Sequence, residues 1–249
     1  MVSAAVGWQC PGCAKDGTTV RRLADLDGAA SANPPVTMVL IGISVAVFLL
    51  GAVLGGDPLG NGSPRVIGDL GVYAAAVDAG EWWRIFTSGF LHFGPIHLGF
   101  NMLMLWRLGS FLERRWGAVR FFALFTAALV GGSAGALILS PGTLTGGASG
   151  AIFGLMGAAF VCRGTDGSRD PMEASLGGLL VMNLVITFAL SNYISVGGHL
   201  GGLLVGGLIG VAIRFDRSKH RVVGLGASIG LGAAALIVGL VVASAPLRG

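Results

Sequence analysis

Seven apolar segments, separated by polar connections, restrict most strongly how this chain can fold. They lie at about residues 36–54, 96–113, 120–140, 149–162, 174–191, 198–214 and 223–244. A helix that crosses a bilayer needs about 20 mostly apolar residues. Only 11% of the residues are charged, which is too few to cover a soluble globule of this size. The sequence therefore predicts an all-α protein that crosses a lipid bilayer several times.

The composition also excludes several other classes of protein. The apolar segments exclude a disordered chain, and Cys10, Cys13 and Cys162 cannot build a disulfide framework. The net charge of +4 is no sign of a nucleic-acid partner, because the basic residues lie between the apolar segments, where they orient a membrane protein. Cys10 and Cys13 supply only two zinc ligands, so we favour a pair of thiols without a metal.

Three regions follow from this pattern. Residues 1–35 are polar and contain no apolar run after the first methionine, so we expect a cytoplasmic tail rather than a signal peptide. Residues 36–215 hold six apolar segments, and residues 216–249 hold a basic connection and the seventh. Twelve of the 16 basic residues would share the side of the tail. The positive-inside rule then predicts a cytoplasmic N-terminus and an extracytoplasmic C-terminus in the cell (inner) membrane.

The fourth apolar segment is short for a span and follows a polar, glycine-rich stretch, residues 141–148. Irregular backbone at membrane depth must be buried by protein or must face water. We therefore expect a water-accessible cavity beside this segment.

Few polar residues lie inside the predicted spans, and all lie toward the outer side. His97 and Asn101 are four residues apart and share a helix face. They could face the cavity together, or they could form hydrogen bonds that hold helices together.

Ser149 opens the fourth segment, with glycines on both sides at residues 146–147 and 150. A serine at a helix start can be an N-cap. Glycines, however, allow an unusual backbone that exposes amide N–H groups near the hydroxyl, and such amides can stabilise an oxyanion.

His199 opens the sixth segment, in which glycines recur at every fourth residue from Gly198 to Gly210. Gly150 and Gly154 offer a matching face on the fourth segment, so we expect close contact between the two helices. Ser149 and His199 would then lie at the same end of this contact. A hydroxyl within reach of an imidazole is the arrangement of an activated nucleophile.

Other hydrolytic chemistries lack their residues. No carboxylate lies inside a predicted span, since Glu113 lies at the inner end of the second segment. A third triad member and a pair of catalytic aspartates are therefore missing, and so is the zinc motif H-E-x-x-H. A metal bound by His92, His97 and His199 would lack a fourth ligand. We predict no metal and no cofactor.

Together these residues resemble the rhomboid family of intramembrane serine proteases. Three motifs match in order: His92-x4-His97-x3-Asn101, Gly147-Ala148-Ser149-Gly150 and Gly198-His199-x2-Gly202. Two shorter elements are also similar to the family's pattern: Glu81-Trp82-Trp83-Arg84 and Glu113-Arg114. The resemblance covers about residues 36–215 and implies a six-helix core followed by one extra C-terminal helix, seven spans in all.

The resemblance implies a serine endopeptidase that cleaves the transmembrane segments of other proteins near the outer face. Ser149 would be the nucleophile and His199 the general base. The Ser149 amide, His97 and Asn101 would form the oxyanion hole. The fifth segment and the loop before it would shape the route by which a substrate reaches the site.

The resemblance also assigns supporting roles. The substrate groove would be formed by Gly147, Gly150 and Phe153. Structural roles would fall to His92, Arg84, Glu113, Gly198 and Gly202. Phe153 stands where many relatives have a tyrosine stacked on the base, so the ring face is kept and the hydroxyl is lost.

Two other functions compete with proteolysis. A catalytically inactive rhomboid-like protein could bind membrane clients, but such proteins usually lack the serine or the histidine, and both are present here. A channel or transporter would show an inverted repeat or ionisable residues along a whole pore, whereas the polar groups of this chain cluster at one end.

Overall fold

The computed structural model describes residues 2–3, 8–9, 34–55, 63–164, 171–215 and 222–245. The chain divides into two compact units, Met1–Ser31 and Ala32–Gly249. In the first unit, strands β1 (Val2–Ser3) and β2 (Trp8–Gln9) pair in antiparallel fashion. Cys10 and Cys13, for which we predict no metal, lie outside the described residues.

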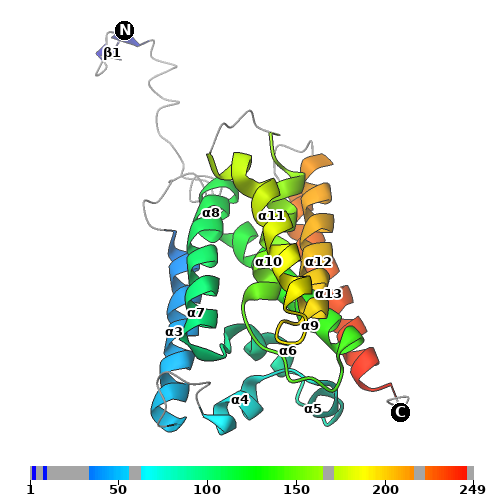
Figure 1. The fold of residues 1–249 in the computed structure, drawn as a ribbon. Helices are drawn as coiled ribbons and strands as arrows, with labels where there is room; N and C mark the ends of the chain where they lie inside the picture. The colour runs from blue at the N-terminus through cyan, green and yellow to red at the C-terminus, as the bar shows by residue number, and fades with distance from the viewer. Residues whose placement is uncertain are drawn as a thin grey trace. The chain divides into compact units, whose positions relative to one another are not determined.

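The described part of the second unit is built from helices (Figure 1). The long ones are α3 (Pro35–Gly55), α9 (Ala118–Leu139), α11 (Pro171–Ala189), α12 (Val196–Phe215) and α13 (Val222–Ala243). The second of the seven predicted segments forms three helical pieces that follow one another directly. They are α7 (Gly94–Met104), the π-helical turn η2 (Leu105–Gly109) and α8 (Ser110–Trp116). The short fourth segment is α10 (Ser149–Val161). All seven predicted segments are therefore helical, with ends within a few residues of those predicted.

Short helices connect α3 to α7. They are α4 (Pro64–Leu70), α5 (Ala74–Asp78), α6 (Arg84–Thr87) and the 3-10 turn η1 (Ser88–Phe90). Figure 1 shows α4, α5 and α6 gathered at one end of the long helices.

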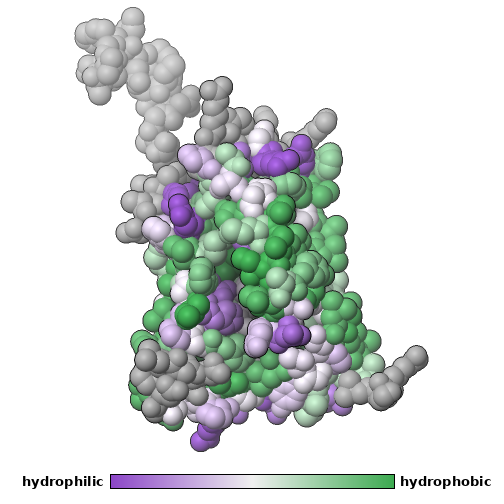
Figure 2. Space-filling model, viewed as in Figure 1, coloured by the Kyte–Doolittle hydropathy of each residue, from purple (hydrophilic) through white to green (hydrophobic). Residues whose placement is uncertain are grey.

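The surface of the helices suits a lipid environment. Among the described helices, α3, α9, α11, α12 and α13 are each long and apolar enough to cross a membrane. The α10 helix is apolar but shorter. Figure 2 shows apolar residues over much of the visible helical flank, with polar residues toward its two ends and in a patch on the lower part of the flank. The structure is therefore all-helical in this unit, with five candidate membrane spans.

Helices α10 and α12 approach one another so closely that only glycine fits at the contact. A Cβ atom placed on Gly202 would lie 1.9 Å from the carbonyl oxygen of Gly150, and one placed on Gly206 would lie 2.0 Å from that of Gly154. Small residues allow such close van der Waals packing, which holds helices together in lipid. The contact predicted between the fourth and sixth segments is confirmed.

Helix α9 adds a third glycine face that the sequence analysis did not predict. A Cβ atom on Gly135 would lie 2.3 Å from the Gly197 carbonyl oxygen, and one on Gly201 would lie 2.3 Å from that of Gly131. The centre of the unit is thus a three-helix contact of α9, α10 and α12.

Glu113, on α8, joins that helix to the start of α3. Its buried carboxylate accepts hydrogen bonds from the Val36 amide (2.9 Å), the Thr37 amide (2.8 Å) and the Thr37 hydroxyl (2.7 Å). The first amides of a helix have no partner within the helix, and the positive end of the helix dipole favours a carboxylate. Glu113 therefore fastens two helices together at this end.

Candidate functional site

The loop before α10 holds Ser149 at the first position of that helix. Gly147 has φ +130°, a conformation that favours glycine, and its amide donates to the Ser88 carbonyl oxygen at 2.8 Å. The N-cap of α10 is Ala148, without a side-chain capping bond. The N-cap interpretation of Ser149, which the sequence left open, is therefore wrong.

The amide N–H and the hydroxyl of Ser149 are both available for hydrogen bonding. Its amide N–H and its hydroxyl form no hydrogen bond with any residue in the described part of the chain. The amide is free because the first N–H groups of a helix lack intrahelical acceptors. The first turn of α10 thus presents a hydroxyl beside an unpaired N–H donor.

His97 places a second donor next to this loop. Its Nδ1 accepts a hydrogen bond from the Phe93 amide at 3.2 Å, so the neutral ring carries its proton on Nε2. That nitrogen faces Gly147, because a Cβ atom placed there would lie only 2.9 Å from it. The Nε2–H group is therefore a donor directed toward the loop that leads to Ser149.

Asn101 lies one helical turn after His97 and is buried. Its Nδ2 donates to the His97 carbonyl oxygen at 2.9 Å, within the same helix. Its Oδ1 has no hydrogen-bond partner among the residues that the structure describes. Neither His97 nor Asn101 therefore joins two long helices by a hydrogen bond, which removes the helix-joining interpretation.

His199 approaches the site from the first turn of α12. Its ring stacks on that of Phe153, with 4.1 Å between the centroids and 20° between the planes. Its Nδ1 lies 2.7 Å from Thr187 Oγ1 on α11. The sequence analysis missed Thr187, although one signal was present: Asn183 and Thr187 are polar, four residues apart, in an apolar segment.

Ser149 and His199 line the same cavity, together with His97 and Asn101. The volume of this cavity is about 1790 Å³, more than the roughly 300–1,000 Å³ of a small-molecule pocket. The described residues show no hydrogen bond between Ser149 and His199. Catalytic hydrogen bonds are often long before a substrate is bound.

The cavity extends from the polar site along the apolar faces of two helices. Phe100 and Met104 line it on the side of α7, and Met182 and Ile186 line it on the side of α11. Only 11% of the residues in the most apolar stretch of α11 are buried. The cavity therefore opens between α7 and α11, where the surface suits lipid or an apolar segment.

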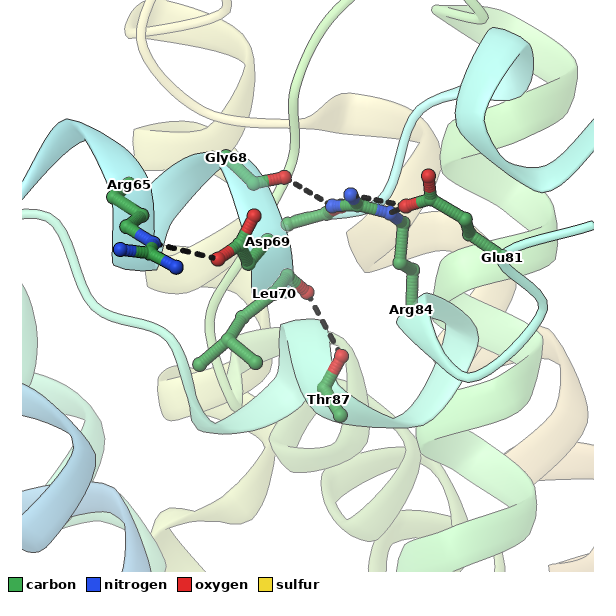
Figure 3. A network of polar contacts seen from close by, with 8 residues as sticks. Arg65, Gly68, Asp69, Leu70, Glu81, Arg84 and Thr87 are labelled. Atoms are coloured by element: carbon green, nitrogen blue, oxygen red, sulfur yellow. Dashed lines mark hydrogen bonds and ion pairs between the residues drawn. The ribbon is translucent and has the colours of Figure 1, made fainter. Parts of the chain in front are cut away.

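Arg84 stabilises the connection between α3 and α7 through the polar contacts drawn in Figure 3. This buried guanidinium pairs with Glu81 and donates to the Gly68 carbonyl oxygen and, at 2.9 Å, to that of Gly71. Thr87, one turn later, donates to the Leu70 carbonyl oxygen at 3.0 Å. Arg84 thus ties α6 to α4 at the end of the bundle.

His92 is a buried residue at the end of the same connection, just before α7. Its Nδ1 lies 3.2 Å from the Phe90 carbonyl oxygen, and its ring centroid lies 5.2 Å from that of His97. Burial and then the neighbouring His97 lower the pKa of His92 to about 4. His92 is therefore neutral near pH 7 and contacts the site through the His97 ring.

Comparison with known proteins identifies similar chains. Residues 79–215 match the family model described as the Rhomboid domain. The chain is 32% identical over 190 residues to the rhomboid protease GluP of Bacillus subtilis, a match that covers 75% of this chain and 36% of the relative. It is 29% identical over 198 residues to the rhomboid protease GlpG of Serratia proteamaculans, which covers 75% and 64%.

A more distant organism supplies a third relative. The chain is 33% identical over 146 residues to the rhomboid-like protease 1 of Toxoplasma gondii, which covers 56% of this chain and 50% of the relative. The matches thus span between 36% and 64% of the lengths of these three proteins.

Proposed function

This chain belongs to the rhomboid family, a multi-pass membrane family, and we propose that it is an intramembrane serine endopeptidase. The observation that carries the proposal is the shared cavity: an unpaired Ser149 hydroxyl and the His199 imidazole line it with two further polar groups. Unsatisfied polar atoms at membrane depth cost free energy. A helix bundle with only a structural role would therefore not gather these groups around one cavity.

In the proposed reaction, His199 takes the proton of the Ser149 hydroxyl as the oxygen attacks the carbonyl carbon of a peptide bond. The carbonyl oxygen becomes an oxyanion, which the Ser149 amide, His97 Nε2–H and Asn101 Nδ2–H stabilise. His199 then gives the proton to the leaving amine. A water molecule, activated by the same base, releases the acyl group from Ser149.

The proposed substrate is a transmembrane segment of another protein. It would enter between α7 and α11, where the cavity lining is apolar. Its peptide bond must leave its helical hydrogen bonds before Ser149 can attack, so a segment weakened by helix-breaking residues is preferred. Gly147, Gly150 and Phe153 line the cavity beside Ser149 and would shape this groove.

We propose seven spans for the chain. Six spans would form a catalytic core over residues 36–215: α3, the continuous run of α7, η2 and α8, then α9, α10, α11 and α12. Helix α13 would be an additional span. The tail before residue 36 would be cytoplasmic, because most basic residues lie on its side of the spans. The active site would then lie toward the outer face of the cell (inner) membrane, and the C-terminus outside.

Purified protein and a panel of transmembrane substrates test the proposal. Ser149→Ala and His199→Ala should each abolish cleavage, and a fluorophosphonate probe should label Ser149 only when His199 is present. Ser228→Ala is the matched control, because Ser228 is a buried serine on α13 whose hydroxyl donates to Gly224. It should cleave and label like the wild type. Cleavage by Ser149→Ala would disprove the assignment of the nucleophile.

A further inference from the structure

The proposed base has a partner on α11. Thr187 is fully buried, and its Oγ1 lies 2.7 Å from His199 Nδ1. The same oxygen lies 2.7 Å from the carbonyl oxygen of Asn183, one turn earlier on α11. Both separations are hydrogen-bond distances, so each contact requires a hydrogen atom between its two heavy atoms.

These two contacts together determine where the proton of the His199 ring lies. A threonine hydroxyl has one hydrogen to donate, and a backbone carbonyl can only accept. The hydroxyl hydrogen therefore points to the Asn183 oxygen, and the imidazole must donate the other hydrogen bond. The neutral ring then carries its proton on Nδ1 and has a free lone pair on Nε2.

The free nitrogen is available for chemistry. Nε2 of His199 forms no hydrogen bond within the described ranges of the chain, and the residue lines the cavity that also contains Ser149. The Phe153 ring covers one face of the imidazole. Thr187 and Phe153 thus restrain the ring at an edge and at a face, and the Nε2 edge stays open.

We propose that Thr187 is a positioning residue that holds neutral His199 in the tautomer able to accept the proton of Ser149. This inference rests on the proposed function. In a serine protease triad, a buried aspartate fixes the tautomer by accepting a hydrogen bond from the base. Here the hydroxyl accepts that hydrogen bond without adding a charge at membrane depth, and its own hydrogen is committed to the α11 backbone.

Two substitutions at Thr187 separate the hydroxyl from the shape of the side chain. Thr187→Val keeps the branched shape and loses the acceptor, whereas Thr187→Ser keeps the acceptor and loses a methyl group. We expect kcat of Thr187→Val to fall by about tenfold to a hundredfold, with KM within about twofold of wild type. Thr187→Ser should restore kcat to within about threefold. Ser228→Ala, which loses a buried intrahelical hydroxyl elsewhere, is the control and should match the wild type.

The tautomer itself can be measured by NMR of protein labelled with ¹⁵N-histidine, at a pH where the imidazoles are neutral. The chain has four histidines, so the His199 signals are those absent from His199→Ala. The wild type and Thr187→Ser should carry the proton on Nδ1, and Thr187→Val should lose this preference. A structural role for Thr187 alone would not move the proton.

Each outcome decides one of the two hypotheses. A proton on Nε2 in the wild type, or a fall in kcat of Thr187→Val with no change of tautomer, would overturn the role of Thr187. So would a kcat of Thr187→Val equal to that of Ser228→Ala. A proton on Nδ1 in a wild type that neither cleaves substrates nor reacts with the probe would overturn the proposed function and still support the hydrogen bond from His199 to Thr187.

Discussion

Replacing Gly202 by alanine tests whether the contact between α10 and α12 sets the geometry of the site. The added Cβ atom would lie 1.9 Å from the Gly150 carbonyl oxygen, and ordinary contact begins near 3.4 Å. The two backbones must therefore separate by about 1.5 Å. Overpacking of this kind costs about 1–3 kcal/mol.

The same helix supplies a matched control. Gly207 has no atom within 4 Å of the position where its Cβ would lie, so Gly207→Ala adds the same methyl group without a clash. The gain in helix propensity, about 1 kcal/mol, is common to both variants and cancels in the comparison. We expect Gly202→Ala to be less stable than Gly207→Ala by about 2 kcal/mol, which for a chain of this size lowers Tm by about 4–8 °C.

Activity should fall with stability, because Gly150 directly follows Ser149. A displacement of about 1 Å at a reacting group can cost roughly 100-fold in rate. Thermal unfolding in detergent gives Tm, and labelling of Ser149 by a fluorophosphonate probe, measured well below Tm, gives the reactivity of the folded protein. Equal Tm values and equal labelling rates for the two variants would refute the argument from close packing.

Substitutions at two further residues test one contact within the site and one contact between helices α8 and α3. Phe153→Ala removes the ring stacked on His199 and should lower both kcat and stability, the latter by about 3–5 kcal/mol. Phe153→Tyr keeps the ring and should retain kcat within a few-fold; similar kcat values for both variants would show that stacking does not matter. Glu113→Gln weakens charged hydrogen bonds to the start of α3 and should cost about 2 kcal/mol of unfolding free energy. The labelling rate of folded Glu113→Gln should equal that of the wild type, and a selective loss of labelling would contradict a structural role.

The helices could be predicted because their signal is local. An apolar segment of sufficient length must satisfy its own backbone hydrogen bonds in lipid, so all seven segments are helical in the structure. The chemistry-bearing residues were also visible, because polar side chains such as Ser149 and His199 are rare inside apolar segments. The spacing of Gly198, Gly202 and Gly206 indicated a face that packs closely.

Tertiary structure was needed to identify the partners of those faces and side chains. Glycine spacing shows that a helix can be approached closely but not by which neighbour, so the contact of α9 with α12 was missed. The hydrogen bond from His199 to Thr187 joins two helices. The four-residue spacing of Asn183 and Thr187 shows only that they share a face of α11, and it does not reveal which helix faces them.

The amino-acid sequence by itself determined that the chain suits a lipid environment, where its helices lie and which polar side chains they carry, because these features depend on residues close together in the chain. The fold alone decided that Ser149 is not a helix cap, that a cavity opens between α7 and α11, and that Thr187 accepts a hydrogen bond from His199. These features depend on distances between segments, which arise only when the helices pack.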